Sequence, residues 1–210
     1  ALAESLLAAR FNTPEHTLVD HFTYALVSDG DLMEGISHEA ASLAGHLGLG
    51  KLVYLFDSNA ITIEGGTDLA NSENTAGRFE NYGWHVQKID GHDRQAIAGA
   101  LEAARGETAR PSIIIATTTI GFGSPNKAGT SGVHGSPLGD EECELTREAL
   151  GWDYPECSVP DEVRPLFLEP GSRGAEKHSA WNEMLEDYRE KNPALAADWD
   201  RMQAGEMPAG

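Results

Sequence analysis

The chain has 210 residues, of which 40% are hydrophobic and 23% are charged, and its formal net charge is −19. This length suits one folded domain with an extension, and this composition excludes an intrinsically disordered chain. The excess of acid disfavours nucleic acid as a partner, because a polyanion would be repelled from most of the surface. A phosphorylated ligand would therefore need a local binding device such as a metal ion or a few histidines.

Hydrophobic periodicity predicts helices that alternate with strands along the first part of the chain. The predicted strands, rich in β-branched and aromatic residues, cover 21–27, 52–56, 84–89 and 112–116. The predicted helices cover 2–11, 34–47, 73–82 and 93–105. Asp93 is a plausible cap for the last of these helices. This alternation predicts an α/β fold with a mostly parallel sheet covered by helices on both faces.

The second part of the chain predicts a different organisation. A Gly-rich loop over 121–139 is too long for a simple connection, and it precedes a short helix over 140–150. A connector with several prolines follows over 151–174, and residues 176–202 are largely helical with a break near Pro193. We therefore predict an α/β domain over 1–150 and a connector with a C-terminal helical segment over 151–210.

The cysteines and the hydropathy of the chain give an expectation for its cellular location. Cys143 and Cys157 lack the spacing of a zinc site or a disulfide framework, which favours a reducing compartment. No apolar run approaches the roughly 20 residues that span a bilayer. The sequence therefore predicts a cytoplasmic protein with no membrane partner.

Polar residues follow two of the predicted strands. Asp29 and Gly30 come directly after the first strand, and Asn59 follows the second. Strand ends of a parallel sheet meet at one edge, where carboxylate and amide oxygens suit a hard divalent cation. Taken alone the pattern is weak, since Asp, Gly and Asn are common turn residues.

The surrounding residues make the pattern more specific. The stretch 28–39, then Leu43-Ala44-Gly45 and residues 48–52, with Asn59 further on, resembles the thiamine-diphosphate motif of transketolases. Similar matches at 79–86, 90–93, 120–139 and 145–152 extend the resemblance over nearly the whole chain. Deoxyxylulose-phosphate synthases and keto-acid dehydrogenases share the Asp and Asn but lack, as a class, the surroundings at 37–39 and 123–127.

The resemblance implies the thiamine-diphosphate-binding fold, and it implies a cofactor site for thiamine diphosphate and Mg²⁺, or Ca²⁺ or another divalent cation. By this resemblance Asp29, Asn59 and the backbone carbonyl of Ile61 bind the metal, and Gly30 contributes to the cofactor site. The family usually has Gly where this chain has Ser28. A serine fits there if its φ is negative, and it leaves open whether cofactor binding is weakened.

The loop match implies further roles. By resemblance, Ile120 lies at the cofactor, while His134 lies beside the diphosphate and acts on the substrate. The alternative for a loop histidine is simple exposure to solvent. Glu34 and Glu39 match glutamates between the two subunits of the family dimer; otherwise they would be ordinary surface acids of a helix start.

The resemblance also implies the reaction, which is transfer of a two-carbon ketol unit between ketose and aldose phosphates in the pentose phosphate pathway. The family's activating glutamate belongs to a pyrimidine-binding domain that we expect beyond residue 210, and an earlier segment is expected before Ala1. We therefore expect the 210 residues alone to be inactive. Three interpretations stay open: a split transketolase subunit in a homo-dimer or hetero-oligomer, a truncated enzyme, or a non-catalytic cofactor-binding module.

Overall fold

The computed structural model describes residues 1–207. They form two compact units. The α/β unit contains Ala1–Leu2 and Phe22–Asp153, and the helical unit joins residues 3–21 to those from Tyr154 onward. The sequence-based boundary at residue 150 did not anticipate that residues 3–21 group with the C-terminal part of the chain.

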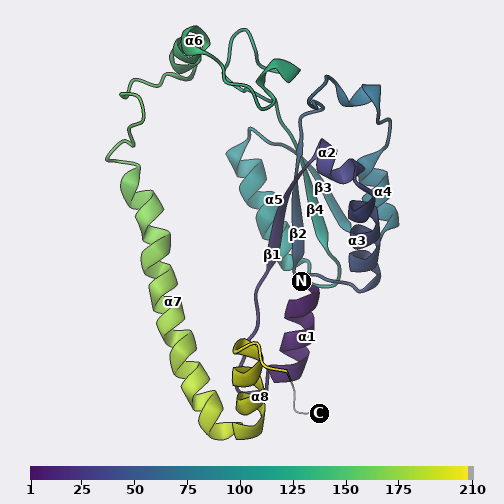
Figure 1. Cartoon of the computed structure of the whole chain (residues 1–210), viewed down its shortest axis with the longest axis vertical. Helices are drawn as coiled ribbons and strands as arrows, with labels where there is room; N and C mark the ends of the chain where they lie inside the picture. The colour runs from purple at the N-terminus through teal and green to yellow at the C-terminus, as the bar shows by residue number, and fades with distance from the viewer. Residues whose placement is uncertain (208–210) are drawn as a thin grey trace. The chain divides into compact units, whose positions relative to one another are not determined.

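The α/β unit is built on four parallel strands in the order β1-β2-β4-β3 (Figure 1). The strands are β1 (Thr23–Ser28), β2 (Leu52–Ser58), β3 (His85–Asp90) and β4 (Ser112–Thr117). The predicted α/β fold with a parallel sheet is confirmed. Ser28 pairs in register with Asp57, and Ser58 pairs with Thr117, so these strands end at one edge of the sheet. The predicted site residues Asp29 and Asn59 directly follow the ends of β1 and β2 at this carboxyl edge.

Helices connect and follow these strands. They are α2 (Asp29–Met33), α3 (Gly35–His46), α4 (Thr75–Asn81), α5 (Arg94–Gly106) and α6 (Asp140–Leu150), with short 3₁₀ turns η1 (Thr67–Leu69) and η2 (Ser131–Val133). Asp93 caps α5 as predicted, because its Oδ1 accepts the backbone N–H groups of Gln95 and Ala96 at 2.8 and 3.2 Å. The sequence did not predict α2, because Asp29 and Gly30 are residue types that are common in turns.

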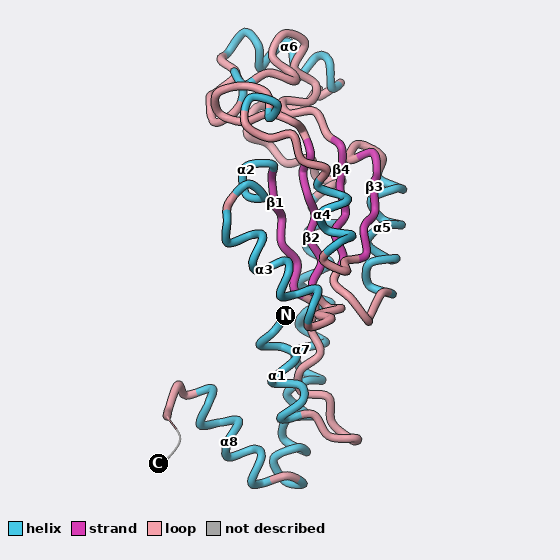
Figure 2. Tube along the Cα trace, turned by 90° about the vertical axis from the view of Figure 1, so that its right-hand side faces the viewer, coloured by secondary structure: helices cyan, strands magenta, loops and turns pink. Residues whose placement is uncertain are grey.

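Both faces of the sheet are covered (Figures 1 and 2). On one face Phe56, Trp84 and Ile113 form a buried cluster with residues of α3 and α4. On the other face Val53 and Ile114 pack against α5. Neighbouring residues of β4 thus point to opposite layers, as the two-residue period of a strand requires.

Close packing explains one glycine of α3. A Cβ added to Gly45 would lie 1.8 Å from the carbonyl oxygen of Tyr82 and 3.3 Å from the ring of Trp84. Only glycine lets α3 approach the turn before β3 this closely. This contact holds α3, and hence the α2–α3 segment that follows β1, against the sheet layer.

The helical unit contains α1 (Leu2–Phe11) except for its first residue, together with α7 (Arg164–Lys191) and α8 (Pro193–Gln203). Its core includes Phe11, Tyr188 and Trp199, and the Tyr188 hydroxyl donates to the Phe11 carbonyl at 2.9 Å. The predicted break at Pro193 is confirmed. The prediction of a connector up to residue 174 was wrong, because α7 begins ten residues earlier.

No helix within residues 1–207 combines the length and apolar character needed to cross a bilayer.

Candidate functional site

The carboxyl edge brings together the first two predicted site residues. Asp29 is the first residue of α2, directly after β1. Its carboxylate accepts the backbone N–H of Ala60 at 3.1 Å, and it also accepts that of Asn59. Residues that are 30 positions apart in the sequence thus meet, as the topology of neighbouring parallel strands predicted.

The turn after β2 has an unusual backbone. Ala60 has φ +60°, in the left-handed region that side chains rarely adopt. The Ile61 N–H donates to Asn59 Oδ1 at 3.0 Å, and Ile61 forms an antiparallel bridge with Gly66. This conformation costs about 1 kcal/mol or more, so the surrounding contacts must enforce it. The same residue donates its N–H to Asp29, so the strained turn and the Asp29 carboxylate are in direct contact.

Ser28 occupies the position where the resembling family usually has glycine. Its φ is −114°, which any residue adopts, so serine fits without strain. It caps α2 through a capping box, in which the Asp31 carboxylate accepts the Ser28 N–H at 2.8 Å. The geometry needs no glycine at this position.

The electrostatics of the edge favour a cation. Burial raises the pKa of Asp29, and the charge of Asp57 raises this pKa further, against the hydrogen bonds from Ala60 and Asn59. Asp57 itself accepts the Thr118 hydroxyl and, at 3.3 Å, the Asn59 amide. A half-buried carboxylate beside a second carboxylate and an amide oxygen fits a hard divalent ion. Within residues 1–207 no cluster of three His, Cys, Asp or Glu side chains could hold a metal, so amide, main-chain or ligand oxygens would complete such a site.

The loop after β4 is attached to the neighbouring strand ends. The Thr119 N–H donates to His92 Nε2 at 3.0 Å, and the His92 ring stacks on Phe122 with 4.1 Å between ring centroids. Ile120 is half-buried, and its carbonyl accepts the Gly129 N–H at 2.8 Å. These contacts fix the start of the Gly-rich loop at the carboxyl edge.

His134 lies further along this loop, directly after η2, and its side chain is exposed. Its backbone N–H donates to the Ser131 carbonyl at 3.0 Å. The backbone hydrogen bonds described for His134 and Ile120 stay within the loop. The structure therefore places both residues on the segment that follows β4, without joining them to Asp29.

The two predicted interface glutamates lie on the surface. Glu34 separates α2 from α3, and Glu39 lies within α3; both are exposed. The Glu34 carbonyl accepts the Ser37 N–H at 3.0 Å, so its backbone has a structural role in starting α3. Their side chains are available to solvent or to another chain.

Sequence reasoning assigned no individual role to three residues that shape this edge or the loop after β4. Asp57 and His92 each follow a predicted strand, and that position was the signal that could have identified them. Glu142, in the acid-rich start of α6, is buried against the loop. No local pattern distinguished it from the exposed acids beside it.

The chain matches known proteins over its full length. The family profile described as transketolase, thiamine diphosphate binding domain, matches residues 1–208. Transketolase 1 of Vibrio cholerae is 51% identical over 210 residues, which cover 100% of this chain and 31% of that relative. The chain thus spans about a third of the length of the curated relatives that it matches.

Solved structures agree with this match. A transketolase from Leishmania mexicana superimposes with a TM-score of 0.95 at 40% identity, covering 100% of this chain and 32% of that one. A transketolase from Pichia stipitis in complex with sedoheptulose-7-phosphate gives 0.93 at 39% identity, covering 100% and 31%. On sequence and structure together, the chain belongs to the transketolase family, as a member of its thiamine-diphosphate-binding domain.

Proposed function

We propose that this chain supplies the diphosphate- and metal-binding half of a transketolase site. The reaction would move a two-carbon ketol unit between ketose and aldose phosphates, in the pentose phosphate pathway of the cytoplasm. The observation that carries the proposal is the junction at which Asp29 receives the backbone N–H groups of the turn after β2. Family membership and the sugar-phosphate complex of the Pichia stipitis relative support it.

The strand-end residues would hold the metal and the cofactor. Asp29, Asn59 and the carbonyl of Ile61 would be ligands for Mg²⁺, or for Ca²⁺ or another divalent cation, and Gly30 and Ile120 would line the cofactor site. Bound thiamine diphosphate would supply the nucleophilic carbon that attacks the ketose. The protein's own part at this edge is to position: the Ala60 and Asn59 N–H groups orient the Asp29 carboxylate.

The loop after β4 would serve the substrate. His134 is exposed on this loop, where an imidazole can exchange a proton with a substrate hydroxyl or carbonyl oxygen and can donate to a phosphate. Ile120 and Phe122 lie at the beginning of the same loop, where the Phe122 ring stacks on His92 from the segment after β3. They would exclude water from the cofactor side of the substrate.

The remaining parts of the site would come from other domains. A pyrimidine-binding domain, on a separate segment or a separate chain, would contribute the acid that activates the cofactor. Glu34 and Glu39 are exposed at the start of α3, and we place them at the interface of a dimer. The proposed partners are thus sugar phosphates and a second copy or a complementary subunit.

The proposal is tested with a chimera in which residues 1–210 replace the 51%-identical segment of the Vibrio cholerae relative. We expect turnover with sedoheptulose-7-phosphate as donor that requires thiamine diphosphate and Mg²⁺. His134→Ala should lower turnover by roughly 10²-fold, since general acid–base catalysis contributes that much. His46→Ala, an exposed histidine at the end of α3, is the control and should leave turnover unchanged.

Two outcomes would contradict the proposal. A folded chimera that binds the cofactor but transfers no ketol unit would indicate a non-catalytic cofactor-binding module. Equal turnover for His134→Ala and His46→Ala would remove His134 from the reaction.

A further inference from the structure

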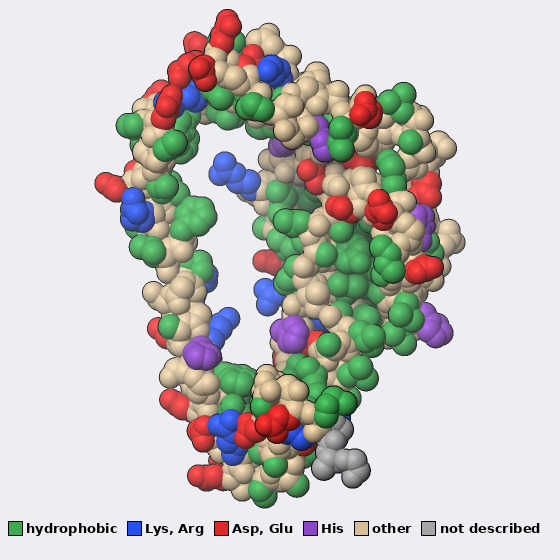
Figure 3. Space-filling view, viewed as in Figure 1, with side chains coloured by type: hydrophobic (Ala, Val, Ile, Leu, Met, Phe, Trp, Pro, Cys, Tyr) green, Lys and Arg blue, Asp and Glu red, His purple; other side chains and the backbone are tan. Residues whose placement is uncertain are grey.

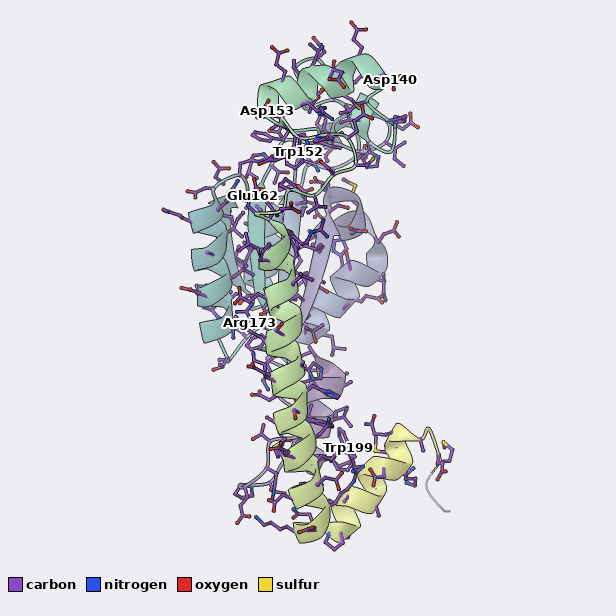
Figure 4. All side chains as sticks on the ribbon, turned by 90° about the vertical axis from the view of Figure 1, so that its left-hand side faces the viewer. Asp140, Trp152, Asp153, Glu162, Arg173 and Trp199 are labelled. Atoms are coloured by element: carbon purple, nitrogen blue, oxygen red, sulfur yellow. The ribbon has the colours of Figure 1, made fainter. Side chains whose placement is uncertain are left out.

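Glu142 is a buried acid in a helix whose neighbouring acids face solvent. It lies in the first turn of α6, and only 7% of its surface is exposed. Glu141 and Glu144 on the same helix are exposed, and acidic side chains gather over α6 at the top of the view in Figure 3. Figure 4 shows Asp140 at the start of α6, with the loop beside the helix. Burying one acid here needs compensation by hydrogen bonds.

The compensation comes from a short segment of the Gly-rich loop. One carboxylate oxygen of Glu142 accepts the Ser124 hydroxyl and, at 2.9 Å, the Asn126 backbone N–H. The other oxygen accepts the Asn126 side-chain amide at 2.9 Å. Ser124 is itself 4% exposed, so these bonds lie away from water. Charge-assisted bonds of this kind are roughly twice as strong as neutral ones.

The anchored segment is connected to the residues that flank the cofactor site. The Ser124 N–H donates to the Gly121 carbonyl at 3.0 Å, and Ser124 Oγ accepts the Lys127 N–H at 3.1 Å. Gly121 has φ +66°, and a Cβ added there would lie 3.0 Å from Val133. Val133 directly precedes His134. A shift at Ser124 would therefore reach Gly121, next to Ile120, and η2, next to His134.

A second hydrogen bond joins the middle of the same loop to its C-terminal end. The Lys127 ammonium donates to the Leu138 carbonyl at 2.7 Å, which joins the middle of the loop to the residues just before α6. The middle of the loop thus has two sets of hydrogen bonds, one to Glu142 and one to Leu138 within the loop itself. Only the first of these two sets joins the loop to a helix, which is α6.

We propose that Glu142 is a positioning residue. It anchors residues 124–126 to α6 and so keeps Ile120 and His134 at fixed positions relative to the carboxyl edge. This role rests on the proposed function, because it matters for turnover only if the loop serves the cofactor and substrate. Glu142 does not touch the reacting atoms. A misplacement of about 1 Å in a catalytic segment can cost roughly 10²-fold in rate, so the anchor has a measurable effect.

The test uses an exchange of the two side-chain partners in the chimera described above. Glu142→Gln/Asn126→Asp keeps one carboxylate and one amide but swaps their places, so the helix would donate the hydrogen bond and the loop would accept it. Asn126→Asp alone sets two carboxylates against each other and should release the loop. Glu142→Ala removes the anchor. Glu144→Gln is the control, since it makes the same charge change at an exposed position of α6.

Two readouts separate this proposal from the proposed function. Tryptic cleavage after Lys127 reports loop release whether or not the chimera is active, and kcat and KM report the effect on the site. We expect Glu142→Ala and Asn126→Asp each to speed cleavage and to lower kcat by roughly 10-fold or more, with a smaller change in KM. The exchanged pair should recover both values to within about threefold of the parent chimera.

The anchor is overturned if the exchanged pair behaves no better than Asn126→Asp alone, or if Glu142→Ala leaves cleavage after Lys127 unchanged. Faster cleavage with an unchanged kcat would show an anchored loop that does not position the site. An inactive parent chimera whose loop still depends on Glu142 would instead contradict the proposed function and leave the anchor standing.

Discussion

Ala60 is the residue at which this site stores backbone strain. Its φ of +60° is costly for any residue with a Cβ, and its N–H donates to the Asp29 carboxylate at 3.1 Å. Glycine would adopt the same φ freely, at the cost of a more flexible unfolded chain. The two effects oppose each other, and the steric one is larger.

Ala60→Gly should therefore raise the free energy of unfolding by about 0.5–1 kcal/mol. Ala98→Gly, at an exposed position inside α5, should lower it by about 1 kcal/mol because glycine is a poor helix former. Urea unfolding of the two variants measures both values. If Ala60→Gly is destabilised as much as Ala98→Gly, the strain at Ala60 is absent in solution.

Sequence reasoning at this scale worked where a residue's position follows from its place after a strand or before a helix. It predicted that Asp29 and Asn59 would meet at the strand ends and that Asp93 would cap its helix. It failed where the role depends on tertiary contacts. The left-handed position of the turn after β2 is occupied by Ala60 and not by glycine, so the sequence gives no signal of it. Glu142 is buried by loop residues that lie 16 to 18 positions away in the sequence.

At the scale of elements, the close approach of α3 to the turn before β3 depends on Gly45, because glycine has no side chain. Gly45→Ala should lower the free energy of unfolding by about 1–3 kcal/mol, because its Cβ would overlap the Tyr82 carbonyl, which cannot swing aside. Gly99→Ala is the matched control in α5, where the new methyl meets nothing within 4 Å. It should be stabilising by about 0.5–1 kcal/mol. Thermal unfolding of both variants measures the contrast, and equal effects would mean that α3 sits farther from this turn.

The tie between α6 and the loop should depend on pH. The hydrogen bonds from Ser124 and Asn126 lower the pKa of Glu142 from 4.5 to about 2, and the charge of Lys127 acts in the same direction. Because the folded pKa lies below the unfolded one, the stabilisation is complete above about pH 4.5 and is lost as the pH falls towards 2.

The difference in free energy of unfolding between the parent chain and Glu142→Gln should thus be constant above about pH 5 and shrink below pH 4.5. Urea unfolding over this range measures it. A difference that grows as the pH falls would have the wrong sign for a carboxylate held ionised by its partners.

The elements themselves were largely predictable, because apolar runs and helical periodicity mark each strand of the sheet and most of its helices. The start of α7 was missed for a physical reason. Pro170 and two glycines within residues 164–174 are typical of a connector, yet α7 continues through them. Pro165 fits the first turn of a helix, where its missing N–H costs nothing.

At the scale of the molecule, the two units each have their own hydrophobic core. The α/β unit uses both faces of its sheet, and the helical unit packs Phe11 and Leu18 with Leu185, Tyr188 and Trp199. The pairing of residues 3–21 with the C-terminal helices spans more than 160 positions. Local sequence patterns hold no information on such a distant contact, which explains why it was not predicted.

The proposed function depends most on Asp29, which the turn after β2 orients and which we propose anchors the metal and the cofactor diphosphate. Calorimetric titration of the chimera with thiamine diphosphate and Mg²⁺ tests this role, comparing Asp29→Ala with Glu80→Ala, an exposed acid on α4 that controls for net charge. We expect Asp29→Ala to weaken binding by roughly 10²-fold or more, while Glu80→Ala binds as the parent does. Equal affinity in a folded Asp29→Ala chimera would contradict this role.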